Sequence, residues 1–195
     1  NAPALFFITT GFINKTLNYW IFIIKHMSKK SLSMFLIKHN PLELLLAIIK
    51  KNALHSVVKK CFKYSYIEEL NKLYSGPNYN NFFLNWDQVN DLKNDNLFEI
   101  GAHTVSHPIL SCLSYVEQDR EIQKSIQCLE SRLGVKIEHF SYPFGGENDF
   151  NESSKSICKD LDIFAYTTQK GNNSLFEKQS IKRIGIHNDT VSELN

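Results

Sequence analysis

The chain has 195 residues, of which 43% are hydrophobic and 22% are charged. This balance excludes an intrinsically disordered polypeptide and is sufficient for one domain with a buried core. The formal net charge of +2 gives no reason to expect nucleic acid or an anionic membrane surface as a partner, and the four cysteines contain no Cys-x-x-Cys pair that would predict a thiolate metal site. The apolar runs at residues 19–24 and 44–49 are too short to span a membrane.

The first third of the chain predicts one strand followed by a helical segment. Leu5–Thr9 is a short apolar run that ends at a Thr-Thr-Gly sequence, which is typical of a buried strand. From residue 14 to about residue 60 the sequence is rich in lysine and apolar residues and has no strand pattern. Pro41 divides this stretch into two expected helical pieces. The apolar spacing at residues 67, 70 and 73 predicts another short helix.

The rest of the chain predicts alternating helices and strands. Asn85 and Gln88 form a capping pattern before a helix, and Ser114 with Glu117 forms a second capping box. The helix that begins at Ser114 has a clear apolar face and is expected to stop at Gly134, and another helix is expected over residues 152–161. Strands are predicted at Phe98–Ile100, Val135–Tyr142, Ile163–Thr168 and Ser180–His187.

Alternating strands and helices indicate an α/β fold with parallel strands and helical crossovers. Functional sites in such folds gather at the carboxyl ends of the strands. Residues 9–10, His103, the segment 143–145 and His187 all occupy such ends in the predicted arrangement. The sequence therefore predicts a site where these segments meet.

The segment FEIGAHTVSHPIL (residues 98–110) carries the strongest chemical signal. His103 and His107 follow a predicted strand, and one turn can bring two imidazoles together around a divalent cation such as zinc. Thr104 and Ser106 can orient these ligands through their hydroxyl groups. The alternative is a pair of ordinary loop histidines, since a hydrolytic zinc site normally has three protein ligands.

The chain resembles the polysaccharide deacetylases, carbohydrate esterase family four. The resemblance rests on the segments APALFFITTGFI, NWDQVNDL, FEIGAHTVSHPILSCLS, HFSYPFGGENDF and AYTTQKGNN in this order. It implies a distorted (β/α) barrel that forms a single domain over residues 1–195. This barrel would be incomplete, lacking its first strand, and would carry a helical insertion at approximately residues 18–60.

The resemblance also implies roles for individual residues. His103 and His107 match the two metal-binding histidines of the family, and the metal is expected to be zinc. Phe144 matches the position whose backbone N–H stabilises the oxyanion, with Tyr142 and Pro143 beside it as substrate-binding residues. His187 matches a late histidine that acts as general acid. The implied reaction is metal-dependent removal of acetyl groups from N-acetylated amino sugars in poly- or oligosaccharides.

The sequence departs from the family pattern in its carboxylates. The family uses an Asp-Asp-Gly motif for the catalytic base and the third metal ligand, but no Asp-Asp pair occurs among these residues. Ser141 also stands where many relatives have an arginine. We expect that the sequence is a piece that lacks the first strand and is inactive in isolation. The alternative is a non-catalytic carbohydrate-binding relative that lacks the motif.

Other features of the protein remain open at this level. A metal hydrolase acting on another small amide is a further possibility, and the lysine-rich helical segment alone would also suit an interaction module. The expected partner is an N-acetylated sugar polymer or oligomer. The location could be cytoplasmic or in the cell envelope.

Overall fold

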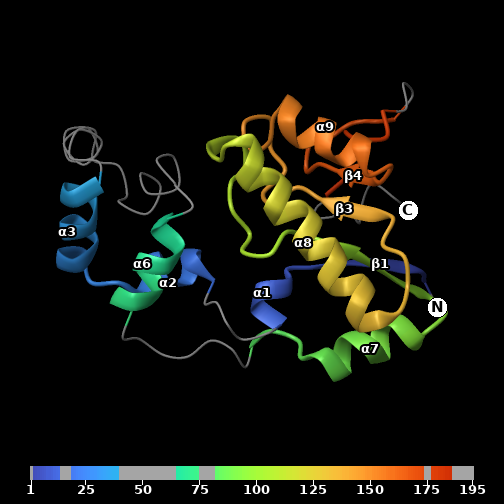
Figure 1. Ribbon diagram of the computed structural model, residues 1–195, viewed down its shortest axis with the longest axis horizontal. Helices are drawn as coiled ribbons and strands as arrows, with labels where there is room; N and C mark the ends of the chain where they lie inside the picture. The colour runs from blue at the N-terminus through green and yellow to red at the C-terminus, as the bar shows by residue number, and fades with distance from the viewer. Residues whose placement is uncertain (1, 14–18, 40–64, 75–81, 174–176, 186–195) are drawn as a thin grey trace, which may run out of the picture.

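A four-stranded parallel sheet forms the centre of the molecule. The computed structural model describes residues 2–13, 19–39, 65–74, 82–173 and 177–185. The strands are β1 (Ala4–Ile8), β2 (Phe98–Ala102), β3 (His139–Ser141) and β4 (Phe164–Tyr166), and they lie side by side in chain order (Figure 1). Each pair is joined by a segment that contains at least one helix, so the predicted α/β class is confirmed. The described strands form an open sheet, as expected of an incomplete barrel.

The strands after β2 are shorter than the sequence predicted. Strand β3 pairs with β2 only through Phe140 opposite Ala102, although a strand was expected from Val135 to Tyr142. Before β3, the backbone N–H of Ile137 donates to the Glu130 carboxylate at 3.1 Å instead of to a neighbouring strand. The alternating pattern of apolar residues in the sequence is therefore longer than the stretch that pairs with neighbouring strands.

Within the last predicted strand, Ser180–His187, one residue pairs with the sheet. Ile181 forms an isolated parallel bridge with Tyr166, which extends the strand order by one position. Residues 186–195 lie outside the described residues, so the end of this prediction is untested.

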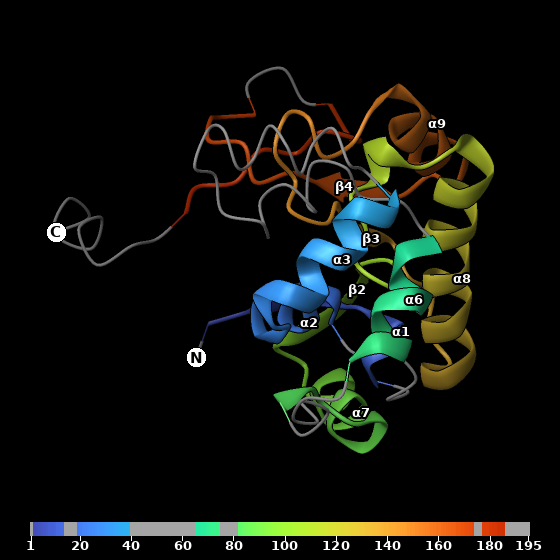
Figure 2. The ribbon, with the colours of Figure 1, turned by 90° about the vertical axis from the view of Figure 1, so that its left-hand side faces the viewer.

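Helices α7 (Trp86–Asn94), α8 (Tyr115–Leu133) and α9 (Glu152–Asp160) follow the predicted pattern. The capping boxes at Asn85 and Ser114 are both present, and Gly134 ends α8 in the left-handed conformation with φ of 65°. Figure 2 shows α8 and α9 on the same side of the sheet. Their apolar faces form the main core together with the strands.

A second hydrophobic core lies in the helical segment. Helices α2 (Trp20–His26), α3 (Lys29–His39) and α6 (Ser65–Leu73) bury side chains that include Trp20, Leu36 and Leu70. Ile109, which follows β2, belongs to the same core, and Phe144 packs against it. The helices α2 and α3 fall within the predicted insertion, while residues 40–64 lie outside the described part. The insertion itself remains a prediction.

The short helices α1 (Thr10–Ile13) and η2 (Leu110–Cys112) follow β1 and the histidine segment. None of the helices in the described ranges is both long and apolar enough to cross a membrane.

Candidate metal and active site

The segment after β2 is anchored to the end of β1. The backbone N–H of His103 donates to the Ile8 carbonyl at 3.0 Å, so the parallel pairing continues to the first histidine. Gly101 precedes it, and a Cβ there would lie 2.7 Å from the Phe7 ring. A side chain at position 101 would therefore push against the Phe7 ring and the His139 carbonyl oxygen, which lies 3.0 Å away.

His103 and His107 come together, as the sequence predicted. Their ring centroids are 4.7 Å apart and the ring planes meet at 79°. Nδ1 of His103 lies 2.6 Å from the Ser141 carbonyl oxygen. Because a carbonyl oxygen only accepts, Nδ1 carries the proton and Nε2 keeps its lone pair. This tautomer is the one that metal-ligating histidines use when their other nitrogen donates to a backbone carbonyl.

His103 is held in its neutral form. Burial lowers its pKa to about 4, the hydrogen bond to Ser141 opposes this shift, and the positive charge of Arg183 adds to it. Arg183 reaches this position from the segment after β4, with Nη2 3.4 Å from the Ser141 hydroxyl and the guanidinium 5.9 Å from the centre of the Phe7 ring. A neutral imidazole is the form that binds metal.

The backbone between the two histidines is held from behind by Glu121 of α8. This side chain is 1% exposed. Its carboxylate accepts the backbone N–H groups of Val105 and Ser106, both at 2.9 Å, and the Ser106 hydroxyl at 2.8 Å. Hydrogen bonds to a charged acceptor are each worth about 1.5–3 kcal/mol. Glu121 was not among the site residues predicted from the sequence, although an acidic residue beside the apolar face of a predicted helix was a visible signal.

Left-handed backbone conformations cluster at this site. Thr104, His107 and Phe144 have φ values of 65°, 57° and 61°, and they are three of the four non-glycine residues with positive φ in the described ranges. Each such residue costs about 1–3 kcal/mol, and such strain concentrates at functional sites. The cluster supports a functional role for this end of the sheet.

The segment predicted to hold the oxyanion lies beside the histidines. Phe144 follows β3, and its ring centroid is 4.8 Å from that of His107. A tight turn forms around it, in which the Gly145 N–H donates to the Pro143 carbonyl at 2.7 Å. The Thr168 hydroxyl donates to the Phe144 carbonyl at 2.6 Å. The turn is therefore fixed from both sides.

Tyr142 occupies a different place from the one a substrate contact needs. Its side chain is fully buried, its hydroxyl donates to the Gln179 carbonyl at 2.8 Å, and its ring stacks on Phe150 at 4.1 Å. The Tyr142 side chain thus supports the turn at Pro143 and Phe144 from the core side.

The helical segment also contacts the site. The Trp20 indole N–H donates to the His107 carbonyl at 3.0 Å, and the Tyr19 ring centroid is 5.2 Å from that of His107. Burial raises the pKa of Tyr19 to about 12, so this phenol stays neutral. The sequence predicted neither aromatic residue at the site, because Trp20 and His107 are 87 positions apart and form no local pattern.

A hollow of about 330 Å³ opens next to His107. Its lining is mostly apolar and includes the rings of Phe12, Tyr19 and Phe83, together with Thr9 at the end of β1. Of the site's two imidazoles, that of His107 lines this hollow.

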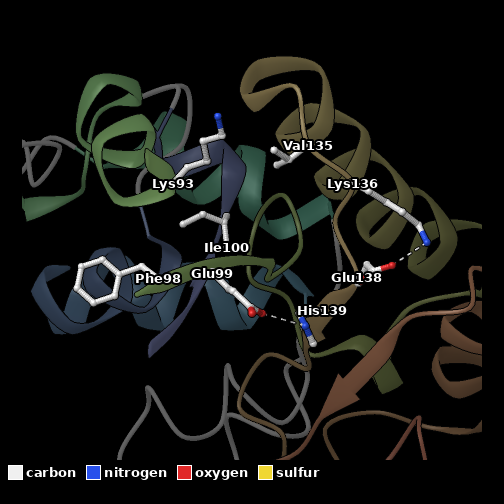
Figure 3. Close-up of a pocket in the computed structure, with 8 residues that line it drawn as sticks. All are labelled: Lys93, Phe98, Glu99, Ile100, Val135, Lys136, Glu138 and His139. Atoms are coloured by element: carbon white, nitrogen blue, oxygen red, sulfur yellow. Dashed lines mark hydrogen bonds and ion pairs between the residues drawn. The ribbon is translucent and has the colours of Figure 1, made fainter. Parts of the chain in front are cut away.

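Another hollow, of about 310 Å³, lies at the opposite, amino ends of β2 and β3 (Figure 3). Glu99 forms an ion pair with Nε2 of His139 at 3.2 Å, and Lys136 pairs with Glu138 at 2.9 Å. The Tyr166 hydroxyl lies 3.0 Å from Nδ1 of His139. His139 thus has partners at both nitrogens.

The donor set at the carboxyl ends fits a divalent cation in part. Two imidazole nitrogens suit zinc and its neighbours. Across the described ranges, however, no group of three His, Cys, Asp or Glu side chains could hold a metal ion. His187, the predicted general acid, lies outside the described residues.

Comparison with known proteins identifies the family. The sequence model described as "Polysaccharide deacetylase" matches residues 1–165. The chain therefore belongs to the polysaccharide deacetylase family, as its sequence segments indicated. No curated protein matches the chain significantly.

Several solved structures match part of the chain. A de-N-acetylase from Aggregatibacter actinomycetemcomitans is 18% identical with a TM-score of 0.51, and the match covers 63% of this chain and 57% of that one. IcaB from Ammonifex degensii is 18% identical with a TM-score of 0.49, covering 57% and 52%. A CE4 family pseudoenzyme from Bacillus anthracis is 24% identical with a TM-score of 0.38, covering 41% and 27%.

The chain matches about half the length of the first two of these proteins. At 18% identity, the likeness to the A. actinomycetemcomitans enzyme shows the fold alone. It agrees with the distorted, incomplete barrel of the deacetylase type that the sequence predicted.

Proposed function

We propose that the chain forms part of a metal-dependent hydrolase that removes acetyl groups from N-acetylated amino sugars in poly- or oligosaccharides. The observation that carries the proposal is the pair of imidazoles 4.7 Å apart, with His103 neutral and its Nδ1 engaged by a backbone carbonyl. Membership of the polysaccharide deacetylase family supports the reaction class.

His103 and His107 would hold the divalent cation, for which we propose zinc. When bound, such a cation supplies Lewis acidity. The backbone N–H of Phe144 would donate to the oxyanion that develops on the acetyl carbonyl. Loss of one such donor typically costs about 2.7–4 kcal/mol. Pro143 would lie next to this donor, beside the substrate. The buried Tyr142 side chain would support the Pro143–Phe144 segment from the core. His187 would protonate the leaving amine.

The base and the third metal ligand have no assigned residue. The sequence contains no Asp-Asp pair, and the described residues provide only the two imidazoles. We therefore expect the 195-residue chain to bind metal weakly and to release little acetate by itself. The same absence favours the second candidate, a carbohydrate-binding relative without catalysis.

The two candidates differ in acetate release. The purified chain, loaded with Zn²⁺ or Co²⁺, would be incubated with oligomers of N-acetylglucosamine, with His103→Ala and His107→Ala as matched controls. Acetate release that both substitutions abolish supports the deacetylase, even if the rate is low. Binding of the oligomer that needs no metal, is unchanged by both substitutions and gives no acetate release supports the binding protein. A chain that binds neither the metal nor the sugar would contradict both candidates.

A further inference from the structure

Glu121 lies on the buried face of α8, where it contacts the loop that separates His103 from His107. The other buried residues of this face are mainly apolar, including Ile122, Ile126 and Leu129. An acidic side chain that is 1% exposed needs donors, and it finds three of them in two consecutive residues, Val105 and Ser106. No residue of the main sheet contributes to this set.

The loop that Glu121 holds is the part of the backbone that fixes the spacing of the imidazoles. Thr104 and His107 are both left-handed, and they flank the two N–H groups that Glu121 accepts. The backbone of L-residues does not favour this conformation by itself. Inside the loop the His107 N–H donates to the Thr104 hydroxyl at 3.0 Å, and from α1 the N–H groups of Thr10 and Gly11 donate to the carbonyls of Thr104 and Val105 at 3.2 and 2.9 Å. These bonds hold the loop through its carbonyls, whereas Glu121 holds it through the N–H groups of Val105 and Ser106.

We propose that Glu121 is a positioning residue, which holds the Val105–Ser106 backbone so that the imidazoles of His103 and His107 converge on one divalent cation. It does not touch the cation. The inference rests on the proposed metal site and deepens it, because it assigns the geometry of the ligands to a helix that contributes no ligand. The competing explanation is a carboxylate that stabilises the fold without affecting the histidines.

The test compares three variants of the purified 195-residue chain. Glu121→Ala removes all three hydrogen bonds. Glu121→Gln keeps an acceptor oxygen for the two N–H groups. Ser125→Ala is the control, because it removes a buried polar group from the same helix face whose hydroxyl bonds only the Ile122 carbonyl of α8. Co²⁺ affinity and the visible Co²⁺ spectrum are measured at a temperature at which circular dichroism shows every variant folded.

We expect Glu121→Ala to weaken Co²⁺ binding at least about 10-fold, as outer-shell substitutions at metal sites do. We expect Glu121→Gln to retain most of the affinity and Ser125→Ala to retain the wild-type value and spectrum. Wild-type affinity in folded Glu121→Ala, or equal weakening by Ser125→Ala, would overturn the proposal. If Glu121→Ala does not fold, Glu121→Asp serves instead, since it keeps the charge and withdraws it by one methylene. Unchanged Co²⁺ binding in folded Glu121→Asp would then overturn it.

Amide hydrogen exchange in the metal-free chain separates this inference from the metal proposal. If the wild type shows no Co²⁺ binding that depends on His103 and His107, the proposed metal function fails. Faster exchange at Val105 and Ser106 in Glu121→Asp, with unchanged exchange in α9, would then still support the inference that Glu121 holds the backbone of this loop. Unchanged exchange at these two amides would overturn the inference itself.

Discussion

The two ends of strands β2 and β3 hold histidines in opposite settings. At the carboxyl ends His103 is neutral, its Nδ1 donates to a backbone carbonyl, and the nearby backbone is left-handed at several residues. At the amino ends His139 pairs with Glu99, whose side chain is 70% exposed (Figure 3). The imidazole of His103, after β2, is thus buried beside constrained backbone. The imidazole of His139, at the start of β3, pairs with a solvent-exposed carboxylate.

This difference shows which end the fold has shaped for chemistry. Exposed ion pairs contribute about 0–1 kcal/mol to stability and tolerate substitution. A buried carboxylate, a fixed tautomer and left-handed residues are costly, and they persist only where surrounding contacts hold them. Among the described residues, the buried Glu121 carboxylate, the fixed tautomer of His103 and three of the four left-handed non-glycine residues lie near the carboxyl ends.

Substitution of His103 and of His139 should give the largest difference in metal affinity. We expect His103→Ala to weaken Co²⁺ or Zn²⁺ binding at least about 100-fold, more than loss of an outer-shell group would, because it removes one of two ligands. His139→Ala should leave the affinity within about 2-fold, since its ring contacts Glu99 and Tyr166 instead. Isothermal titration of both variants checks this. Equal losses would mean that the ends of the sheet are not distinct.

Two glycines with the same backbone conformation should differ in their cost. Gly145 and Gly134 have φ values of 66° and 65°, but a Cβ at Gly145 would lie 2.8 Å from the Thr168 backbone nitrogen, whereas nothing lies within 4 Å at Gly134. We expect Gly134→Ala to lower the free energy of unfolding by about 1 kcal/mol and Gly145→Ala by about 3 kcal/mol. Urea denaturation measures both. A similar loss for the two would show that the turn after β3 relaxes without cost.

The contact between the helical segment and the site can be tested with two tryptophans. Trp20→Phe removes the donor to the His107 carbonyl and leaves a small cavity, so we expect a loss of about 2 kcal/mol and a several-fold weaker metal affinity. Trp86→Phe, at a partly buried residue that packs against the main core, should lower stability without changing metal affinity. Thermal melts and Co²⁺ titrations separate the two effects. Unchanged affinity in Trp20→Phe would remove α2 from the site.

The smallest effect is expected at the amino ends. The hydrogen bond from Lys136 holds the pKa of Glu138 below its ordinary value, so this pair can only stabilise the fold above that ordinary pKa, and its contribution is lost as the pH falls through the lowered value. Both groups are exposed to solvent and screened by salt. Glu138→Gln should therefore leave the melting temperature unchanged between pH 3 and pH 7. A shift at pH 7 that persists at high salt would contradict this.

Local patterns in the sequence predicted the helix ends and the position of the histidine pair. The capping boxes at Asn85 and Ser114 and the stop at Gly134 depend on residues three or four positions apart, so the sequence shows them directly. His103 and His107 are also neighbours in sequence. Strand lengths were less well predicted, because pairing of β3 depends on which residues of β2 and β4 lie opposite.

Contacts between distant segments could not be predicted in this way. Ser141 fixes the tautomer of His103, Glu121 holds the loop, and Trp20 reaches the His107 carbonyl, across 38, 15–16 and 87 residues respectively. The side chain of Tyr142 faces the core because it shares a strand face with buried Phe140.

By itself, the sequence determined the family, the α/β class and the two imidazoles, since each is written in short segments with fixed spacing. Only the tertiary structure decided how those imidazoles are protonated, oriented and supported. Burial and long-range hydrogen bonds set these properties, and both arise only when strands and helices far apart in the chain pack together.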